Sequence, residues 1–568
     1  MNSPDRSSRY ASLYLTLAVA LSAVPLIALS RSELIGYDGF WHVFIARQDD
    51  WSNFWDEVHR NAHPPLFYLC LKAAVALFGA SPVVYRLVPI VATLGSTWLV
   101  GRIVQKTTGR FWLPAVAAFA FGASLTTVSI GLDVRAYALG TFFMLWACLA
   151  LLELVGRGFA APDHRARWVF ALTAGLALLT HYAASIFLVG CCVAAAIPAL
   201  VDRDYRHRLS ADVRRRWLPN LLTFGVPLAV LAIEYSVHMS SWTKRGFNHL
   251  SSFLFDPRRE GALEFVWRNT GALFELFVPP LVYRRFTSTL VVTGPSLTGA
   301  AVVALVIFSL AAVAWLGCRP ARGGGGPAVA RRVPPVLLVA MTALVIALAL
   351  AGRYPYGGPL RHQFFLFPFA VIVAALVVDE VALRTNRRIG ALAVGLFALA
   401  SLANTANWLD HFRITRGYLW QDEIDRFRAA FPAPAAVQVD QFNLIHLFTH
   451  HHDRSWRFVR RIEGSGAVDV WRVGDADSRE FYICRDRGQW QLDLSAPVTY
   501  LRMAGCLEAT GAERVVVFRP QQNGTTASWP LAQTEEVVAT AAERAGLTPE
   551  TVTVSGDDVY AAFGRPER

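Results

Sequence analysis

A run of acids, histidines and tryptophans follows the first apolar segment of the chain. Between Gly36 and Leu66 the sequence reads GYDGFWHVFIARQDDWSNFWDEVHRNAHPPL, in a protein whose charged residues are otherwise sparse. Carboxylates and imidazoles are the side chains that most often move protons in catalysis. The spacing Asp38-x-x-x-His42 would place both groups on one face of a helix, although an exposed loop acid has the same signature. We interpret residues 31–82 as a candidate catalytic loop.

Two later motifs place ionisable groups at the ends of apolar segments. GLDVRAYAL brings Asp133, Arg135 and Tyr137 to the start of one segment. An ionisable group inside a membrane helix costs about 2.5–3.5 kcal/mol, so it tends to pair or to line a polar cavity. A local Asp133–Arg135 pair with a snorkelling arginine is the structural alternative. His181 and Tyr182 divide the apolar stretch 168–201 into two halves.

A third motif supplies a cation. Arg361 and His362 follow the turn YPYGGP and precede the apolar run QFFLFPF. An arginine at this place can simply anchor the helix among lipid headgroups. It can equally hold a phosphate through its fork of N–H donors. Both interpretations remain open from the sequence.

The composition is that of a membrane protein. Of 568 residues, 54% are hydrophobic and 17% charged, against about 25% charged in a soluble domain. The net charge of +12 could suggest a nucleic-acid partner, but Lys and Arg lie in short clusters between apolar runs. Such clusters are typical of cytoplasmic loops that fix membrane topology. We therefore predict an all-α polytopic domain and no nucleic-acid partner.

Spanning helices need about 20 mostly apolar residues. About eleven segments meet or approach this length, and we predict that they span: 11–30, 83–104, 111–130, 134–155, 168–181, 184–201, 218–238, 290–317, 334–351, 363–380 and 389–408.

The apolar segment 64–80 decides the topology. It is short, begins with Pro64-Pro65 and carries Lys72. If it lies on the outer surface and the N-terminus is inside, the basic clusters of the apolar domain all fall on the cytoplasmic side, as the positive-inside rule favours. These clusters are Arg102/Lys106/Arg110, Arg157/Arg165/Arg167, Arg203–Arg216, Arg319–Arg332 and Arg384/Arg387/Arg388.

This topology gathers the candidate site at the outer ends of the helices. Asp38 is the candidate catalytic residue. The candidate binding residues are His42, His63, Asp133, Arg135, Tyr137, His181, Tyr182, Lys244, Arg361 and His362. We expect the remaining acids of the loop, Asp49, Asp50, Asp56 and Glu57, to form a solvated surface.

A second, polar domain follows the first. We place the boundary between 1–409 and 410–568, and the runs AAVQVD, VDVWRV, FYICR and RVVVF alternate with the helical EEVVATAAERAGL, which predicts a soluble α/β domain. Cys484 and Cys506 are its only cysteines, so a disulfide is plausible if it faces an oxidising compartment. His450, His451 and His452 with Asp453 could bind a metal, but a solvated turn fits the pattern better.

The order of these pieces resembles a known family. An acid after the first helix, then HPPLFYLCL, FGASPVVYRLVP, DVRAYAL, LLTHYA and RHQFFLFPF, is similar to the bacterial branch of the glycosyltransferase C superfamily. The resemblance covers roughly residues 10–410. It implies transfer of a sugar from a polyprenyl-phosphate carrier, with Asp38 in the place of the family's acid and with Arg135, His181 and Arg361 near the donor.

The chain departs from that family at two positions. Gly39 stands where a second acid often follows the first, and Asp133 stands where glutamate is common. Both departures weigh against a family-like metal site, so the metal ligands stay unassigned and a divalent cation stays only possible. A polyprenyl phosphate leaves without much protonation, so one base for the acceptor and one cation for the phosphate would suffice.

We therefore predict an inverting glycosyltransferase of the bacterial inner membrane. Its partners would be a polyprenyl-phosphate sugar, a glycan, lipid or protein acceptor, and membrane lipids. The N-terminus would be cytoplasmic, and the active site and C-terminal domain extracytoplasmic. The alternative is a transporter or flippase of lipid-linked glycans, which would need polar residues near the bilayer midplane on several spans.

Overall fold

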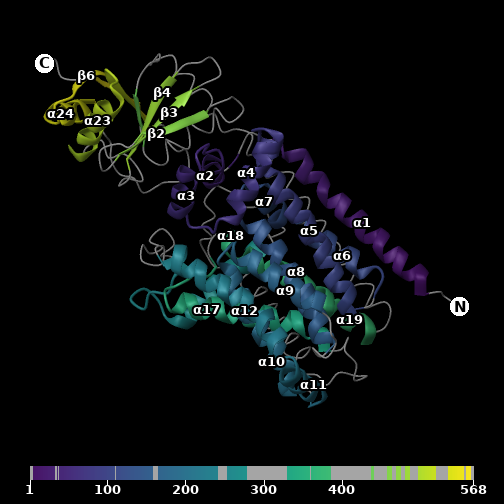
Figure 1. Ribbon diagram of the computed structural model, residues 1–568. Coiled ribbons are helices and arrows are strands. Elements are labelled where there is room, and N and C mark those ends of the chain that lie inside the picture. The colour runs from purple at the N-terminus through teal and green to yellow at the C-terminus, as the bar shows by residue number, and fades with distance from the viewer. Residues whose placement is uncertain are drawn as a thin grey trace.

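A long helical bundle and a smaller sheet domain make up the computed structural model (Figure 1). The residues described are 4–31, 35, 37–108, 110–157, 164–201, 203–240, 253–277, 329–357, 360–384, 436–439, 457–462, 468–474, 480–486, 497–519, 535–555 and 558–564.

The bundle consists of helices in chain order. They are α1 (Pro4–Leu29), α2 (Tyr37–Ala46), α3 (Trp51–Arg60), α4 (Leu66–Phe78), α5 (Pro82–Thr108), α6 (Leu113–Gly122), α7 (Leu125–Leu132), α8 (Tyr137–Gly156), α9 (His164–Leu178), α10 (Ala183–Val201), α11 (Arg203–Arg215), α12 (Trp217–Glu234), the π-helical η1 (Tyr235–Met239), α14 (Ala262–Phe277), α17 (Val333–Leu350), α18 (Leu360–Gln363), the 3₁₀ turn η3 (Phe364–Leu366) and α19 (Phe367–Arg384).

Several of these helices are membrane spans by length and composition. Among the described residues, six helices are long and apolar enough to cross a membrane, or seven if the bent pair α6–α7 counts as one. The chain is therefore a multi-pass membrane protein. The predicted segment 168–181 corresponds to α9, which has only 15 residues. The part Ala183–Ile197 of α10 is among the shorter apolar helices. The predicted spans 290–317 and 389–408, and the boundary at 409, lie outside the described residues.

Two breaks interrupt the helices of the bundle. Ser124 ends one helix and starts another, because its hydroxyl accepts a hydrogen bond from the Thr127 N–H and caps α7. The axes of α6 and α7 differ by 57°. The predicted break at His181 is also present, between α9 and α10. Backbone irregularity at membrane depth is tolerated where protein or a cavity surrounds it.

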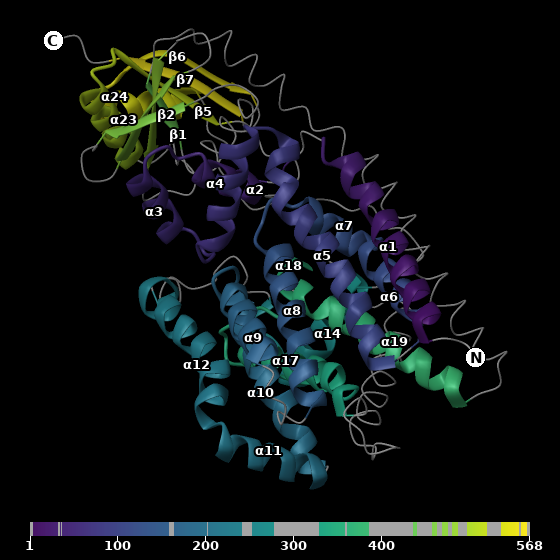
Figure 2. The same cartoon turned by 45° about the vertical axis from the view of Figure 1, so that its right-hand side comes forward.

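The two ends of the bundle differ in chemistry. At one end lie α2, α3 and α4, and at the other lies the basic helix α11, as two views agree (Figures 1 and 2). Asp379 of α19 pairs there with Arg110, which follows α5, and with Arg331, which precedes α17, each at 2.9 Å. The described members of the basic clusters thus lie at the ends of helices whose other ends approach Asp38.

Hydrogen bonds of the short helix α4 attach the candidate catalytic loop to the bundle. It has 13 residues, too few to cross a hydrocarbon core of about 30 Å at about 1.5 Å per residue. The Leu66 N–H donates to the Leu179 carbonyl at 2.9 Å, at the end of α9. The Lys72 ammonium bonds the carbonyls of Ala46 and Gln48, so the positive charge caps the C-terminal end of α2.

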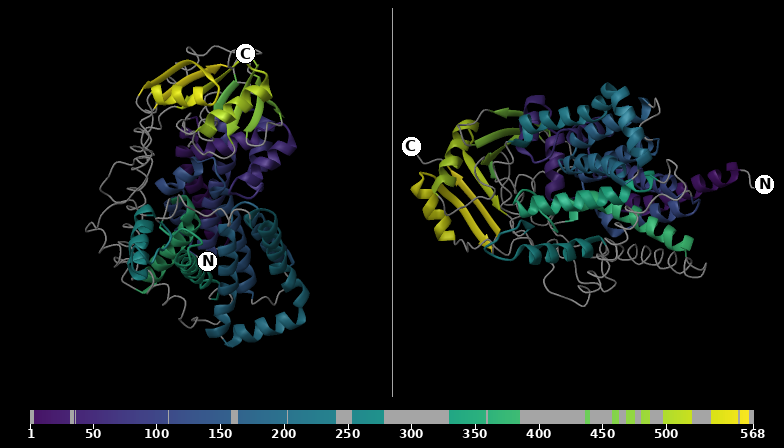
Figure 3. Two further views of the ribbon diagram at one scale, coloured as in Figure 1. Left: turned by 90° about the vertical axis from the view of Figure 1, so that its left-hand side faces the viewer. Right: turned by 90° about the horizontal axis from the view of Figure 1, so that it is seen from below.

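The C-terminal residues form a seven-stranded mixed sheet with α23 (Pro497–Thr510) and α24 (Glu535–Arg544). Its strands are β1 (Ala436–Val439), β2 (Arg457–Ile462), β3 (Val468–Gly474), β4 (Glu480–Asp486), β5 (Arg514–Arg519), β6 (Thr548–Ser555) and β7 (Asp558–Gly564). The order is β2-β3-β4-β1-β5-β7-β6, and only β1 pairs in parallel, with β4 and β5. The four predicted strand runs correspond to β1, β3, β4 and β5; β2, β6, β7 and α23 were not predicted. The sheet lies beyond α2 and α3 in every view (Figure 3).

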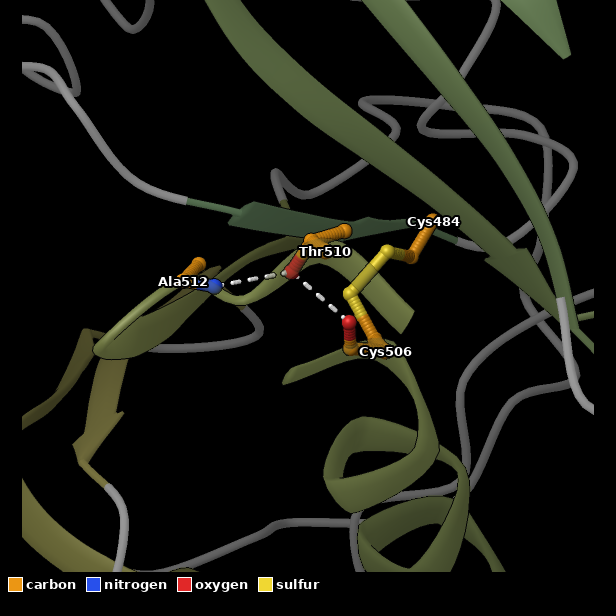
Figure 4. The surroundings of a disulfide bond; sticks show 4 residues. All are labelled: Cys484, Cys506, Thr510 and Ala512. Carbon is orange, nitrogen blue, oxygen red and sulfur yellow. Dashed lines mark hydrogen bonds between the residues drawn. A yellow bond between two sulfur atoms is a disulfide. The ribbon is translucent and has the colours of Figure 1, made fainter. Parts of the chain in front are cut away.

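A disulfide ties the sheet to its helix. Cys484 of β4 and Cys506 of α23 are bonded, with their Cα atoms 6.0 Å apart (Figure 4). The bond that the sequence left conditional is therefore present. His450, His451, His452 and Asp453, proposed above as a turn, lie outside the described residues.

The double variant Cys484→Ser/Cys506→Ser should lower the free energy of unfolding of the sheet domain by about 3 kcal/mol, because the bond closes a loop of 22 residues. Hydrogen exchange of the α23 peptides measures this loss. The control Cys70→Ser should leave the exchange unchanged, and equal exchange in both variants would contradict the expectation.

Candidate functional site

Asp38 lies between two arginines from distant parts of the chain. Its Oδ2 accepts a hydrogen bond from Arg135 Nη1 at 2.6 Å and lies 3.3 Å from Arg361 Nη1. Asp38 is in the first turn of α2, Arg135 is in the link between α7 and α8, and Arg361 is in α18. The side chain of Asp38 stays 37% exposed, so a ligand can reach it. Arg135 thus pairs with Asp38 rather than only with its neighbour Asp133.

The two carboxyl groups here have opposite pKa shifts. Desolvation raises the pKa of Asp38, but the positive charges of Arg135 and Arg361 outweigh it and bring the pKa to about 2. Burial raises the pKa of Asp133, and its arginine neighbours only partly offset this. Opposite environments for two nearby acids often separate their chemical roles. Asp38 is the one that is firmly ionised.

Gly39 explains how α2 comes so near to the Arg135 segment. A Cβ built on Gly39 would lie 2.8 Å from Ile35 Cγ2 and 3.4 Å from Val134 Cβ. It would also lie 3.7 Å from an Asp133 carboxyl oxygen. A second acid at position 39 would therefore crowd α2 and face a like charge. The close approach of α2 to the Arg135 segment therefore favours glycine at position 39.

A stack of aromatic rings continues inward from Asp38. The ring of His42 lies 5.3 Å from that of His63, and His63 lies 5.4 Å from His181. Tyr137 lies 4.9 Å from His181, and the Arg135 guanidinium is 5.1 Å from the Tyr137 ring. The structure thus brings these predicted residues into one cluster with Asp38. Tyr68 joins the cluster with its ring 5.0 Å from His42, although we did not single it out from the sequence.

The histidines of the cluster are neutral. Burial and the nearby Arg135 charge lower the pKa of His42 to about 3 and that of His181 to about 3. Burial also lowers the pKa of His63 well below its ordinary value. His42 Nδ1 lies 2.6 Å from the Asp38 carbonyl and must donate to it, which leaves Nε2 as an acceptor. None of the three can serve as a cation for a phosphate near neutral pH.

His181 lies at the break between α9 and α10. Its Nδ1 accepts a hydrogen bond from the Ala183 N–H at 3.0 Å and so caps the start of α10. Gly140 of α8 makes room for it, because a Cβ at that position would lie 3.1 Å from the His181 Cβ. The adjacent Tyr182 has its ring beside that of His238, at a centroid distance of 5.9 Å. Its hydroxyl bonds His238 Nδ1.

Hydrogen bonds fix the turn that precedes Arg361. The Tyr356 N–H donates to the Phe253 carbonyl at 3.0 Å, and the Tyr354 hydroxyl donates to the His362 carbonyl at 2.7 Å. Gly357 has a φ of 70° and packs against Asn269, whose carbonyl oxygen would lie 2.4 Å from an added Cβ. His362 approaches Tyr137 with a ring distance of 6.1 Å. Lys244, the other predicted cation, lies outside the described residues.

Arg86 is, after Tyr68, the second residue here to which we assigned no role from the sequence. Its guanidinium donates to the Leu132 carbonyl at 3.1 Å and to the Ser30 carbonyl at 2.9 Å. These bonds join the end of α1 to the end of α7, one residue before Asp133. A lone arginine within an apolar span was the signal for it, since a charge at that depth needs partners.

Polar atoms without partners surround the two arginines. In the described part of the chain, Arg135 Nε, Arg361 Nε, His42 Nε2 and the hydroxyls of Tyr68 and Tyr137 are buried and make no hydrogen bond. A cavity lined by Tyr137, Thr141, Met144, His181, Arg361 and Phe365 lies beside them. Buried polar atoms are normally satisfied, so a cluster of unsatisfied ones marks a place for a polar ligand.

The described residues form no site for a divalent metal. The described residues contain no group of three or more His, Cys, Asp or Glu side chains that could share an ion. Two guanidinium groups lie beside Asp38 Oδ2, and their positive charge disfavours a cation there. No chemical step below needs a metal.

Comparisons with known proteins give structural matches only. No protein-family model and no curated protein matches the chain. The structure is similar to an oligosaccharyltransferase of Archaeoglobus fulgidus, in a complex with Zn and sulfate, at 13% identity and a TM-score of 0.45 over 89% of this chain and 68% of that one.

It is also similar to ArnT of Cupriavidus metallidurans. The match is at 15% identity and a TM-score of 0.38 with undecaprenyl phosphate bound, over 77% of this chain and 85% of that one. For the apo state the values are 16% and 0.39, over 78% and 85%. Identities this low say nothing about donor, acceptor or site residues.

Because these histidines are neutral in the folded protein, we predict that the stability of the protein depends on pH. Their pKa values lie below the unfolded value of about 6.5, so the unfolded state binds more protons and stability falls as the pH drops from about 6.5 toward 3. In detergent, the melting temperature should fall over this range, and the fall should be smaller in His181→Asn. The exposed control His164→Asn should follow wild type. Parallel curves for all three proteins would contradict the assignment.

Proposed function

We propose that the chain is an inverting membrane glycosyltransferase that moves a sugar from a polyprenyl-phosphate donor to an acceptor at the outer face of the membrane. The observation that carries the proposal is an ionised, accessible Asp38 beside two arginines with unpartnered N–H groups, at one end of the spanning helices. A base and a phosphate-binding cation are the groups that this reaction requires.

Arg361 and Arg135 are placed to hold the donor phosphate. Both guanidinium groups have a buried Nε without a partner, and arginine binds phosphate through parallel N–H donors. The hydroxyls of Tyr68 and Tyr137 add neutral donors near Arg135. Because the cluster lies at the ends of apolar helices, a polyprenyl chain could remain in the bilayer while its phosphate reaches the arginines.

The proposed step is a single displacement. Asp38 takes the proton of the acceptor's nucleophile, the nucleophilic atom attacks the anomeric carbon, and the bond from that carbon to the phosphate oxygen breaks. The electrons of this bond leave with the polyprenyl phosphate, whose charge the arginines stabilise. Attack from the side opposite the leaving group inverts the anomeric centre.

Donor binding would also activate Asp38. In the ligand-free protein the carboxylate is a weak base, since its two arginines lower its pKa to about 2. A bound phosphate competes for the same guanidinium charges, so the pKa of Asp38 should rise toward its ordinary value. Binding of the donor would thus prepare the base.

The side of the membrane follows from charge and redox chemistry. The basic helix α11 and the Arg110–Asp379–Arg331 group lie at the end opposite Asp38, which suits a cytoplasmic location. The Cys484–Cys506 disulfide belongs to the sheet domain that lies beyond α2 and α3, and disulfides persist in oxidising compartments. Both observations support an extracytoplasmic site and sheet domain.

A transporter of lipid-linked glycans is the alternative. It would need charged residues or broken helices near the bilayer midplane on several spans. The described ionisable groups instead gather at the two ends of the helices. Transfer of labelled sugar, or its absence, separates the two functions.

Asp38→Asn should lower transfer by about 10²- to 10⁴-fold, because the amide cannot accept the proton. The assay incubates purified protein with labelled polyprenyl-phosphate sugars and candidate acceptors. The exposed loop variant Asp49→Asn is the control and should keep its activity. Equal activity of Asp38→Asn and wild type, or no transfer by wild type from any donor, would end the proposal.

Arg361→Gln should shift the acid limb of kcat/KM, which reports the free enzyme, to higher pH. The reason is that burial raises the pKa of Asp38 and only Arg135 would remain to oppose it. In this variant we expect kcat/KM to fall with decreasing pH already above about pH 4, whereas in wild type we expect no such fall in that range. Arg353→Gln, at an exposed position of the same turn, is the control. Identical profiles would show that Arg361 does not act on Asp38.

A further inference from the structure

A buried ion pair joins the sheet domain to the candidate catalytic loop. Arg485 Nη2 lies 2.6 Å from Glu57 Oε1, and Nη1 donates to Oε2 at 3.1 Å. The side chains are only 3% and 2% exposed. The expectation that Glu57 forms part of a solvated surface is therefore wrong. The sequence around Glu57 does not reveal this burial, because its partner Arg485 lies 428 positions away.

An aromatic contact reinforces the pair. The Arg485 guanidinium lies 4.7 Å from the Trp471 ring, whose edge meets Phe44 at a ring distance of 5.7 Å and an angle of 87°. Phe44 and Trp471 are each 1% exposed. Phe44 belongs to α2, the helix that carries Asp38 and His42. The contact thus reaches the candidate base through one short helix.

Side chains from three strands on one face of the sheet belong to the core of the bundle. Along a strand, successive side chains point to opposite faces. Trp471, Val516 and Ala562 belong to the apolar core of the helical bundle, whereas their neighbours Val470, Val515 and Phe563 belong to the separate core with α23 and α24. The sheet therefore has helices of its own on one face and the α2–α3 side of the bundle on the other.

The helices α2 and α3 need such support. Each has 10 residues, and helices shorter than about 12 to 15 residues are marginal without tertiary packing. Lys72 holds the end of α2 from the bundle side. A buried, two-pronged ion pair favours one relative orientation of its two elements, because any other leaves a charge unpaired.

We propose that the C-terminal domain is a positioning module for the active site, with Arg485 and Trp471 holding α2 so that Asp38 stays against Arg135 and Arg361. The role in transfer rests on the proposed function, whereas the hold on α2 does not. Arg485 touches no reacting atom and acts through Glu57 and α2.

The test compares full-length Arg485→Met with Arg514→Met, a matched control in the same sheet. Arg514 pairs with Glu550 at 3.7 Å, and these side chains are 45% and 38% exposed. In Arg485→Met, hydrogen exchange of residues 37–60 should be about tenfold faster. Exchange of residues 497–519 should stay unchanged, which shows that the domain itself remains folded.

Transfer kinetics complete the test. With α2 displaced, kcat should fall about ten- to a hundredfold while the control matches wild type. The charge exchange Glu57→Arg/Arg485→Glu should recover part of both losses, since it restores a pair, whereas Glu57→Arg alone should not. Unchanged exchange in Arg485→Met, or faster exchange with full kcat, would overturn the inference. If wild type transfers no sugar, the proposed function fails, and the exchange of residues 37–60 alone decides whether the domain holds α2.

Discussion

The structure depends on one carboxylate held between two guanidinium groups. Asp38, Arg135 and Arg361 come from three separate segments, and each is costly at the end of a membrane helix unless the others are present. Their pairing therefore requires α2, the link between α7 and α8, and α18 to end at the same place. Among these three side chains the positive charge exceeds the negative charge, and each arginine keeps a buried Nε–H without a partner that could bind an anion.

Breaks in the helices make this meeting possible. The ends of α7, α9 and α17 each give way to irregular backbone on the same side of the bundle, and polar side chains or backbone bonds satisfy the free groups. Arg86 joins the end of α7 to the end of α1 by donating to the carbonyls of Leu132 and Ser30. The opposite end contains acids enclosed by arginines, such as Asp379 and Asp212. One end thus anchors the bundle, and the other has donors to offer a ligand.

The sheet domain changes how the loop after α1 is understood. The loop is rich in acids, but they differ in environment. Asp50 caps α3 by accepting from the Ser52 N–H, Glu57 binds the sheet through Arg485, and Asp38 pairs with Arg135 and Arg361. Of these three acids, only Asp38 is both accessible and placed between two arginines. The loop is consequently a layer between two domains as well as a candidate catalytic segment.

The sequence by itself determined the membrane class, most spanning segments, the short helix after Pro64-Pro65 and the cluster of candidate residues. It could do so because apolar length, proline and charge clusters act locally along the chain. Only the tertiary structure decided that Arg135 pairs with Asp38, that His42, His63 and His181 are neutral, that Tyr182 turns to His238 and that Glu57 is buried. These properties arise from contacts between residues far apart in the chain and from burial, which no local pattern encodes.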